Sequence, residues 1–165
     1  MSKRLLAAVL ALTILGAFAS PSWAARLKEG DTVPEMSFSM LSGKTVKLAD
    51  LAKGNSAVVI TFIQTACSTC KGEIIELNKL VKSGKGKVAV LPIAVDMRSG
   101  KDFLENYKSE NAVDFDFGID PKFSIPVQFG ISFTPASIVI KDGKVFKILR
   151  GYDEEVSGEL AKLFN

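Results

Sequence analysis

The stretch that decides the fold is AVVITFIQTACSTC, residues 57–70. Its first half, 57–63, is a continuous apolar run rich in β-branched residues, which predicts a strand buried on both faces. Cys67 and Cys70 follow directly, and apolar residues then recur at helical spacing from Ile74 to Val81. The two cysteines therefore stand at the junction between a buried strand and a helix.

The segments on either side of this junction complete an alternating pattern of strands and helices. Before and at the junction, the sequence predicts a hairpin over 34–47, a helical turn near 50–51, the strand 57–63 and the helix that ends at 83–84. A strand over 88–95, a helix over 102–107, a short strand over 115–118 and a short helix over 121–129, entered through Asp120, follow. The last part of the chain predicts strands 136–140 and 145–149, joined by Asp142-Gly143, and a helix over 153–164. We therefore expect an α/β fold with a central mixed sheet flanked by helices.

The first 24 residues have the layout of a secretory signal peptide. Lys3 and Arg4 form a basic start, 5–18 is apolar, and Ser22-Trp23-Ala24 provides small residues for cleavage. The apolar run is shorter than the roughly 20 residues of a spanning helix. We expect cleavage after Ala24, which leaves one exported, periplasmic domain over 25–165 without stable membrane insertion. An uncleaved N-terminal anchor is the alternative.

Composition excludes several classes of function. The chain has no histidine and two cysteines, so it cannot build a Ser-His-Asp triad, a histidine metal site or a four-thiolate cluster. Loss of Lys3 and Arg4 with the signal peptide lowers the net charge from +3 to about +1, which offers no electrostatic footprint for nucleic acid. We expect no cofactor and no resident metal.

The spacing of the cysteine pair indicates redox chemistry. Unpaired N–H groups and the helix dipole stabilise a thiolate at a helix start, so Cys67 is expected to attack and Cys70 to resolve the mixed disulfide. Three alternatives stay open. The first is a structural disulfide, which stabilises the fold by about 2 kcal/mol for so small a loop. The others are covalent haem attachment, although Lys71 stands where histidine is needed, and binding of a soft metal such as Cu(I).

At this point the chain resembles a known family, the thioredoxin-like extracytoplasmic thiol–disulfide proteins, which include the reductants of cytochrome c maturation. The likeness rests on GDTVPEMSF at 30–38 with SGKTVKL at 42–48, on Cys67-Ser-Thr-Cys70, on FTPASIVI at 133–140 and on KDGK at 141–144. It implies a thioredoxin-like fold with an N-terminal β-hairpin, and a periplasmic thiol–disulfide oxidoreductase that acts as a disulfide reductant.

The resemblance also implies roles for individual residues. Pro135 matches the family's cis-proline, which faces the disulfide and, with Thr134, offers backbone to a substrate. A trans proline at the start of a strand is the alternative. Glu73 matches an acidic residue that could relay a proton or raise a thiol pKa, with an ordinary first-turn glutamate as the alternative. Protein disulfides or dithiols are the implied partners, and a membrane thiol–disulfide protein is a possible electron donor.

The active-site loop departs from the family pattern. Ala66 stands where tryptophan commonly precedes the first cysteine, and Ser68 and Thr69 place no proline between the cysteines. Thr61 replaces the buried acid of cytoplasmic thioredoxins. Among wider redoxins, peroxidases place threonine where Gln64 stands, and copper-delivery proteins use a histidine that this chain lacks. The alternative function is a thioredoxin-like module that binds Cu(I), through its two thiolates, or a partner, without turnover.

Overall fold

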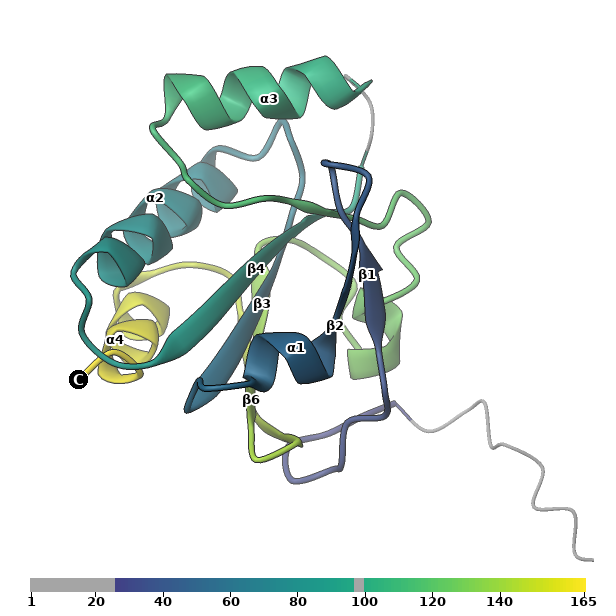
Figure 1. Ribbon diagram of the computed structural model, residues 1–165, viewed down its shortest axis with the longest axis vertical. Helices are drawn as coiled ribbons and strands as arrows, with labels where there is room; N and C mark the ends of the chain where they lie inside the picture. Colours follow the sequence, from purple (N-terminus) through teal and green to yellow (C-terminus); the bar gives the residue numbers. More distant parts are fainter. Residues whose placement is uncertain (1–25, 97–99) are drawn as a thin grey trace, which may run out of the picture.

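The computed structural model describes residues 26–96 and 100–165, so the predicted signal peptide, 1–24, lies outside the described residues. A five-stranded sheet with the order β5-β4-β3-β6-β7 forms the centre (Figure 1). Its strands are β3 (Ala57–Ile63), β4 (Val88–Ala94), β5 (Gly118–Ile119), β6 (Ala136–Lys141) and β7 (Lys144–Arg150). A separate hairpin pairs β1 (Ser37–Ser39) with β2 (Thr45–Lys47).

The sheet is mixed, as the order of predicted elements indicated. β3 is parallel to β4 and antiparallel to β6, while β7 runs antiparallel beside β6. The helices are α1 (Leu48–Ala52), α2 (Ser68–Lys82), α3 (Gly100–Glu110) and α4 (Glu154–Lys162), with a 3-10 helix, η1, at Pro126–Phe129. The expected thioredoxin-like α/β architecture with an N-terminal hairpin is confirmed.

Alternate residues of β3 face two different layers, and every one of its residues is buried. Val58, Ile60 and Phe62 pack against the side that carries the hairpin, α1 and η1. Val59 packs with Leu77 of α2 and other residues on the side that carries α2 and α4, and Figure 1 shows these two helices together on one side of the sheet. Burial of each large apolar side chain contributes roughly 1.5–3 kcal/mol, so both layers stabilise the strand that leads to the cysteines.

Two predicted elements differ from the structure. The strand expected at 115–118 lies at Gly118–Ile119, and the helix expected at 121–129 is reduced to η1. The carboxylate of Asp120 accepts hydrogen bonds from the Ser124 hydroxyl and the Ile125 N–H, at 2.7 Å each. Phe123 between them has a φ of 56°. This left-handed residue prevents a continuous α-helix over the segment.

The Asp142-Gly143 hairpin is confirmed, because it joins β6 to β7 and both residues have positive φ, 50° and 71°. This is the backbone of a two-residue turn that matches strand twist. Across 26–96 and 100–165, no helix is long and apolar enough to span a bilayer.

In the loop between α2 and β4, Gly86 lies against the backbone of the C-terminal segment. A Cβ atom there would lie 2.8 Å from the Cα of Phe164, and the φ of Gly86 is +72°. Gly84 in the same loop has a φ of +66° but no described atom within 4 Å of its Cβ position.

We therefore expect Gly86→Ala to lower the free energy of unfolding by at least about 2 kcal/mol, through left-handed strain and overpacking. Gly84→Ala is the matched control and should cost about 1 kcal/mol, because it carries the backbone strain alone. Urea unfolding measures both values. Equal losses in the two variants would contradict the close approach of Phe164.

Candidate active site

The cysteine pair lies where α2 begins. Cys67 is the N-cap of this helix, and its Sγ accepts a hydrogen bond from the Cys70 N–H at 3.1 Å. The two residues form a disulfide. Cys67 is half-buried, whereas Cys70 is only 1% exposed and packs with Ile74 and other apolar residues. One sulfur is thus within reach of a partner and the other lies inside the fold.

Polar contacts hold the loop before Cys67 from two sides. The backbone N–H and the hydroxyl of Thr65 donate to the two carboxylate oxygens of Asp96, at 2.8 and 3.1 Å. On the other side, the Thr134 hydroxyl donates to Oε1 of Gln64 at 3.2 Å. The sequence interpretation missed Asp96 and the contact of Gln64. A signal existed, because Asp96 follows β4 and the carboxyl ends of the parallel strands β3 and β4 meet at one edge.

The loop that carries Thr134 and Pro135 reaches this same edge. β6 begins beside the end of β3, where Ala136 pairs with Phe62. The Thr134–Pro135 peptide bond is cis. Thr134 is half-buried and Pro135 is buried. Phe133, the preceding residue, is 50% exposed, which leaves an aromatic side chain on the surface beside the loop.

The exposed tip of the site consists of the remaining predicted loop residues. Ala66, Ser68 and Thr69 are all exposed. The Thr69 Oγ1 lies 3.9 Å from the Cys67 Sγ. The residues next to Cys67 along the chain are therefore small or polar, while Cys67 also packs against the apolar cluster that contains Cys70.

Glu73 is fully buried and lies beyond the first turn of α2. Its Oε1 accepts hydrogen bonds from the hydroxyls of Thr61, at 3.1 Å, and Ser137, at 2.5 Å. Burial raises the pKa of Glu73 from 4.5 to about 7, against a lowering effect of these two hydrogen bonds. Ser137 was missed by the sequence interpretation, because a serine inside a predicted strand carries no signal of its own.

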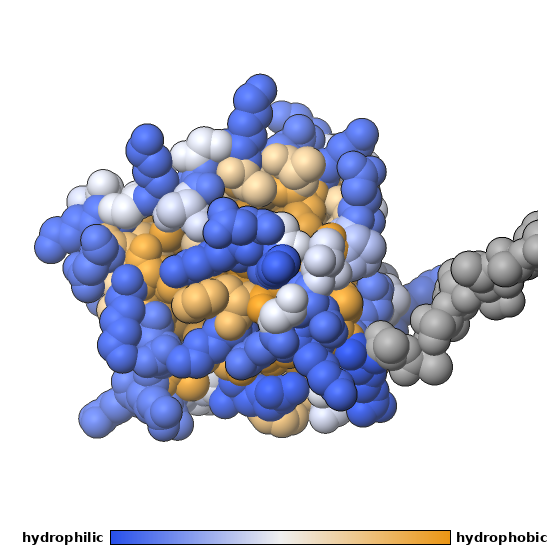
Figure 2. Space-filling model, turned by 90° about the horizontal axis from the view of Figure 1, so that it is seen from below, coloured by the Kyte–Doolittle hydropathy of each residue, from blue (hydrophilic) through white to orange (hydrophobic). Residues whose placement is uncertain are grey.

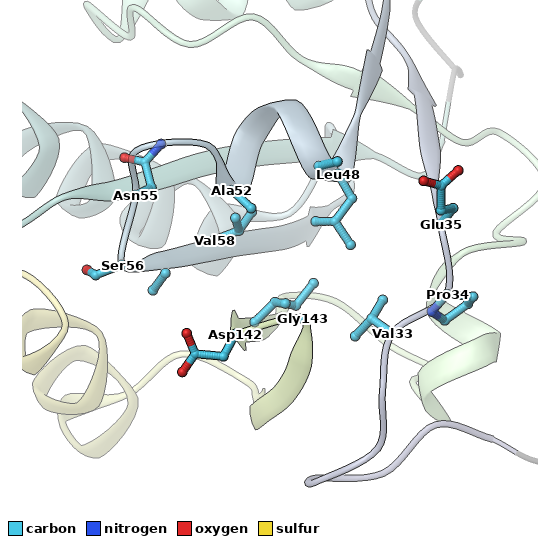
Figure 3. A pocket seen from close by; sticks show the side chains of 13 residues that line it. Val33, Pro34, Glu35, Leu48, Ala52, Asn55, Ser56, Val58, Asp142 and Gly143 are labelled. Atoms are coloured by element: carbon cyan, nitrogen blue, oxygen red, sulfur yellow. The ribbon is translucent and has the colours of Figure 1, made fainter.

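An apolar pocket of about 190 Å³ lies away from the cysteines, between α1 and the β6–β7 turn (Figure 3). Figure 3 shows Leu48, Val58 and Val33 around it. Because its wall includes the first residues of β3, and Cys67 follows the last, the two sites lie at opposite ends of that strand. Seen from below, charged and polar side chains cover much of the surface and apolar side chains are visible between them (Figure 2).

No group of three or more cysteine, aspartate or glutamate side chains is arranged to hold a metal ion among the described residues. Cys67 and Cys70 are joined in a disulfide, so neither sulfur is a free thiolate in this structure. The arrangement is a strand–CxxC–helix junction with a buried carboxyl beside it, which is the site of a redoxin-type thiol–disulfide protein.

The comparisons with known proteins agree with this class. The AhpC/TSA family matches residues 30–148, and the chain belongs to that family. A comparison with curated protein sequences finds no match.

Solved structures with the same fold include three bacterial proteins. The thioredoxin domain of a thiol-disulfide oxidoreductase from Bacteroides vulgatus has 22% identity and a TM-score of 0.65, over 84% of this chain and 99% of that chain. Peroxidoxin BcpB from Mycobacterium tuberculosis has 20% identity and a TM-score of 0.68, over 83% and 96%. A secreted disulfide oxidoreductase from Mycobacterium tuberculosis has 20% identity and a TM-score of 0.63, over 78% and 96%. At these identities the likenesses show the fold.

The raised pKa of Glu73 makes the stability of the disulfide form depend on pH. Its buried carboxyl binds a proton more tightly in the folded than in the unfolded chain, so its contribution to stability falls as pH rises from 4.5 to about 7. The full loss is on the order of 3 kcal/mol. We expect Glu73→Gln to remove this decline, as measured by urea unfolding across that range.

The matched control for this experiment is Glu110→Gln, at an exposed position of α3. A decline of the same size in wild type and Glu73→Gln would show that another group causes it.

Proposed function

We propose that this protein is an exported, periplasmic thiol–disulfide oxidoreductase that reduces disulfides in protein substrates. The observation that carries the proposal is the placement of Cys67 and Cys70, one sulfur accessible at a helix N-terminus and the other buried one turn inside. Membership of the AhpC/TSA family and the redoxin-type site support thiol chemistry. The reductive direction is taken from the sequence resemblance.

In the proposed reaction the protein starts as a dithiol. The Cys67 thiolate attacks one sulfur of a substrate disulfide, which forms a mixed disulfide and releases the first substrate thiolate. Cys70 then loses its proton and attacks the Cys67 sulfur, which closes the intramolecular disulfide and releases the second substrate thiolate. Two electrons and two protons pass to the substrate. A dithiol donor, of which a membrane thiol–disulfide protein is one candidate, must then return the protein to its reduced form.

The N-terminus of α2 supplies the electrostatic help for this reaction. The N-cap position of Cys67 places its sulfur against the N–H of Cys70, and the positive end of the helix dipole favours a thiolate there. Cys67 is only half-buried, so a partner can reach it. Cys67 is therefore the nucleophile and Cys70 the resolving thiol.

Glu73 is suited to handle the proton of the buried thiol. It lies three residues after Cys70 on α2, so the two side chains are neighbours on one helix face. With a pKa of about 7, its carboxyl can accept or return a proton near neutral pH. In the proposed mechanism Glu73 accepts the Cys70 proton when that thiol attacks.

Thr134 and Pro135 are proposed to bind the substrate backbone, since their loop stands at the sheet edge that carries Cys67. The exposed ring of Phe133 extends this surface. An extended protein segment can thus contact both the loop backbone and an aromatic side chain, whereas a small disulfide cannot.

The periplasmic location rests on the signal-peptide pattern of residues 1–24 and on cleavage after Ala24, which leaves a thioredoxin-like domain over 25–165. One structural relative is described as secreted. Both support export of this chain.

Single cysteine substitutions test the assigned roles. We expect Cys67→Ser to abolish reduction of a small aromatic disulfide, because the remaining thiol, Cys70, is buried and a serine hydroxyl does not exchange with disulfides. Cys70→Ser should instead accumulate mixed disulfides with protein substrates, detected on non-reducing gels. Full turnover by the Cys67→Ser variant would contradict the proposal.

Phe133→Ser tests the proposed docking surface. We expect KM for a disulfide-containing protein to rise several-fold, because about 1 kcal/mol of aromatic contact is lost, and kcat/KM for a small disulfide to stay unchanged. Phe146→Ser, at a similarly exposed phenylalanine of β7, is the control. Equal effects of both variants would refute a docking role for Phe133.

A further inference from the structure

Two hydroxyl side chains interrupt the apolar face of the sheet beneath α2. Thr61 and Ser137 are directly opposite each other in the antiparallel pairing of β3 with β6. Both are completely buried. Opposed residues of this kind have Cβ atoms about 4.5–5.5 Å apart. Since Val59 and Val139 of the same face are apolar core residues, the hydroxyl pair is a local exception within it.

Both hydroxyls donate to the same oxygen of Glu73. Oε1 accepts from Thr61 at 3.1 Å and from Ser137 at 2.5 Å. Oε2 is buried and has no hydrogen-bond partner among the residues that the structure describes. In a neutral carboxylic acid the carbonyl oxygen is the better acceptor, so two donors at Oε1 place the acidic proton on Oε2.

The other ionisable groups near Glu73 come from its own helix and from the segment after β7. Cys70 precedes it by one turn of α2, and Glu76 follows it and opposes its ionisation. Tyr152 donates to Glu76, and so does the Ser157 hydroxyl, at 2.6 Å. Tyr152 and Ser157 are thus hydrogen-bonded to Glu76 and not to Glu73. The hydrogen bonds to Glu73 come from the hydroxyls of Thr61 and Ser137.

We infer that Thr61 and Ser137 are positioning residues, which clamp Oε1 of Glu73 and leave Oε2 as the oxygen that exchanges the proton of the Cys70 thiol. The inference deepens the proposed function and rests on it for the thiol step. When Cys70 attacks the mixed disulfide, its proton forms the O–H bond at Oε2 while both hydroxyls stabilise Oε1. In this chain the threonine that replaces the buried acid of cytoplasmic thioredoxins thus takes part in holding an acid supplied by the helix.

The experiment compares Thr61→Val, Thr61→Ser and Ser137→Ala with wild type by carbon-13 NMR titration of the Glu73 carboxyl. Loss of a hydrogen bond to a carboxylate raises its pKa, so we expect the midpoint to rise by about 1 pH unit in Thr61→Val and in Ser137→Ala. Thr61→Ser keeps the hydroxyl and should restore the wild-type midpoint. Ser157→Ala removes a hydroxyl from Glu76 instead and is the matched control.

The pH profile of disulfide reduction provides the second measurement. One limb of this profile reports the ionisation of Glu73. The pH at its midpoint should shift together with the NMR midpoint in Thr61→Val and Ser137→Ala, and should not change in Thr61→Ser and Ser157→Ala. If the Glu73 midpoint is unchanged in both Thr61→Val and Ser137→Ala, the two hydroxyls do not position Glu73, even if turnover is normal. A wild-type protein that turns over no disulfide would instead overturn the proposed function, while the NMR titration would still decide whether the hydroxyls hold Glu73.

Discussion

The hydrogen bond from the Cys70 N–H to the Cys67 sulfur is the interaction on which the site depends. It makes Cys67 the cap of α2, so the residue that begins the helix is also the one that presents a sulfur to the surface. Because the helix start has unpaired N–H groups in any case, a sulfur that satisfies one of them is held in place and stabilised as an anion. The position of Cys70, buried one turn later, follows from the same helix.

The surrounding sheet supports this helix start from two directions. Asp96, beyond the end of β4, holds Thr65 in the loop, and Thr134, before β6, reaches Gln64. Beneath the helix, Glu73 accepts hydrogen bonds from the central strand β3 and from its neighbour β6. Burying a carboxyl in an apolar core is costly unless it is hydrogen-bonded or neutral. The hydroxyls and the raised pKa of Glu73 meet both conditions. In the proposed mechanism this carboxyl accepts the proton of the Cys70 thiol.

Much of the fold could be predicted from sequence because its signals are local. The apolar run 57–63, the helical spacing after Cys70 and the Asp142-Gly143 turn all correspond to observed elements. The prediction of a helix over 121–129 was wrong, because the Asp120 side chain accepts a hydrogen bond from a backbone N–H of this segment. Helical spacing in the sequence does not reveal such competition. Cys67, Cys70 and Glu73 could be named as candidates from the sequence, whereas Ser137 could not, since its partner Glu73 lies 64 residues away. Asp96 was missed although its place after the end of β4 was a usable signal, because its partner in the loop is 31 residues distant.

The equilibrium reduction potential of the Cys67–Cys70 pair shows whether these cysteines exchange disulfides and in which direction. It is measured by incubating the purified protein in defined thiol–disulfide buffers and quantifying the oxidised fraction. We predict reversible exchange with a potential at or below about −230 mV, in the range of thioredoxin-like reductants. A value near about −120 mV would mark an oxidant and contradict the reductive direction. A pair that does not exchange with the buffer at all would contradict the assignment of these cysteines as a redox site.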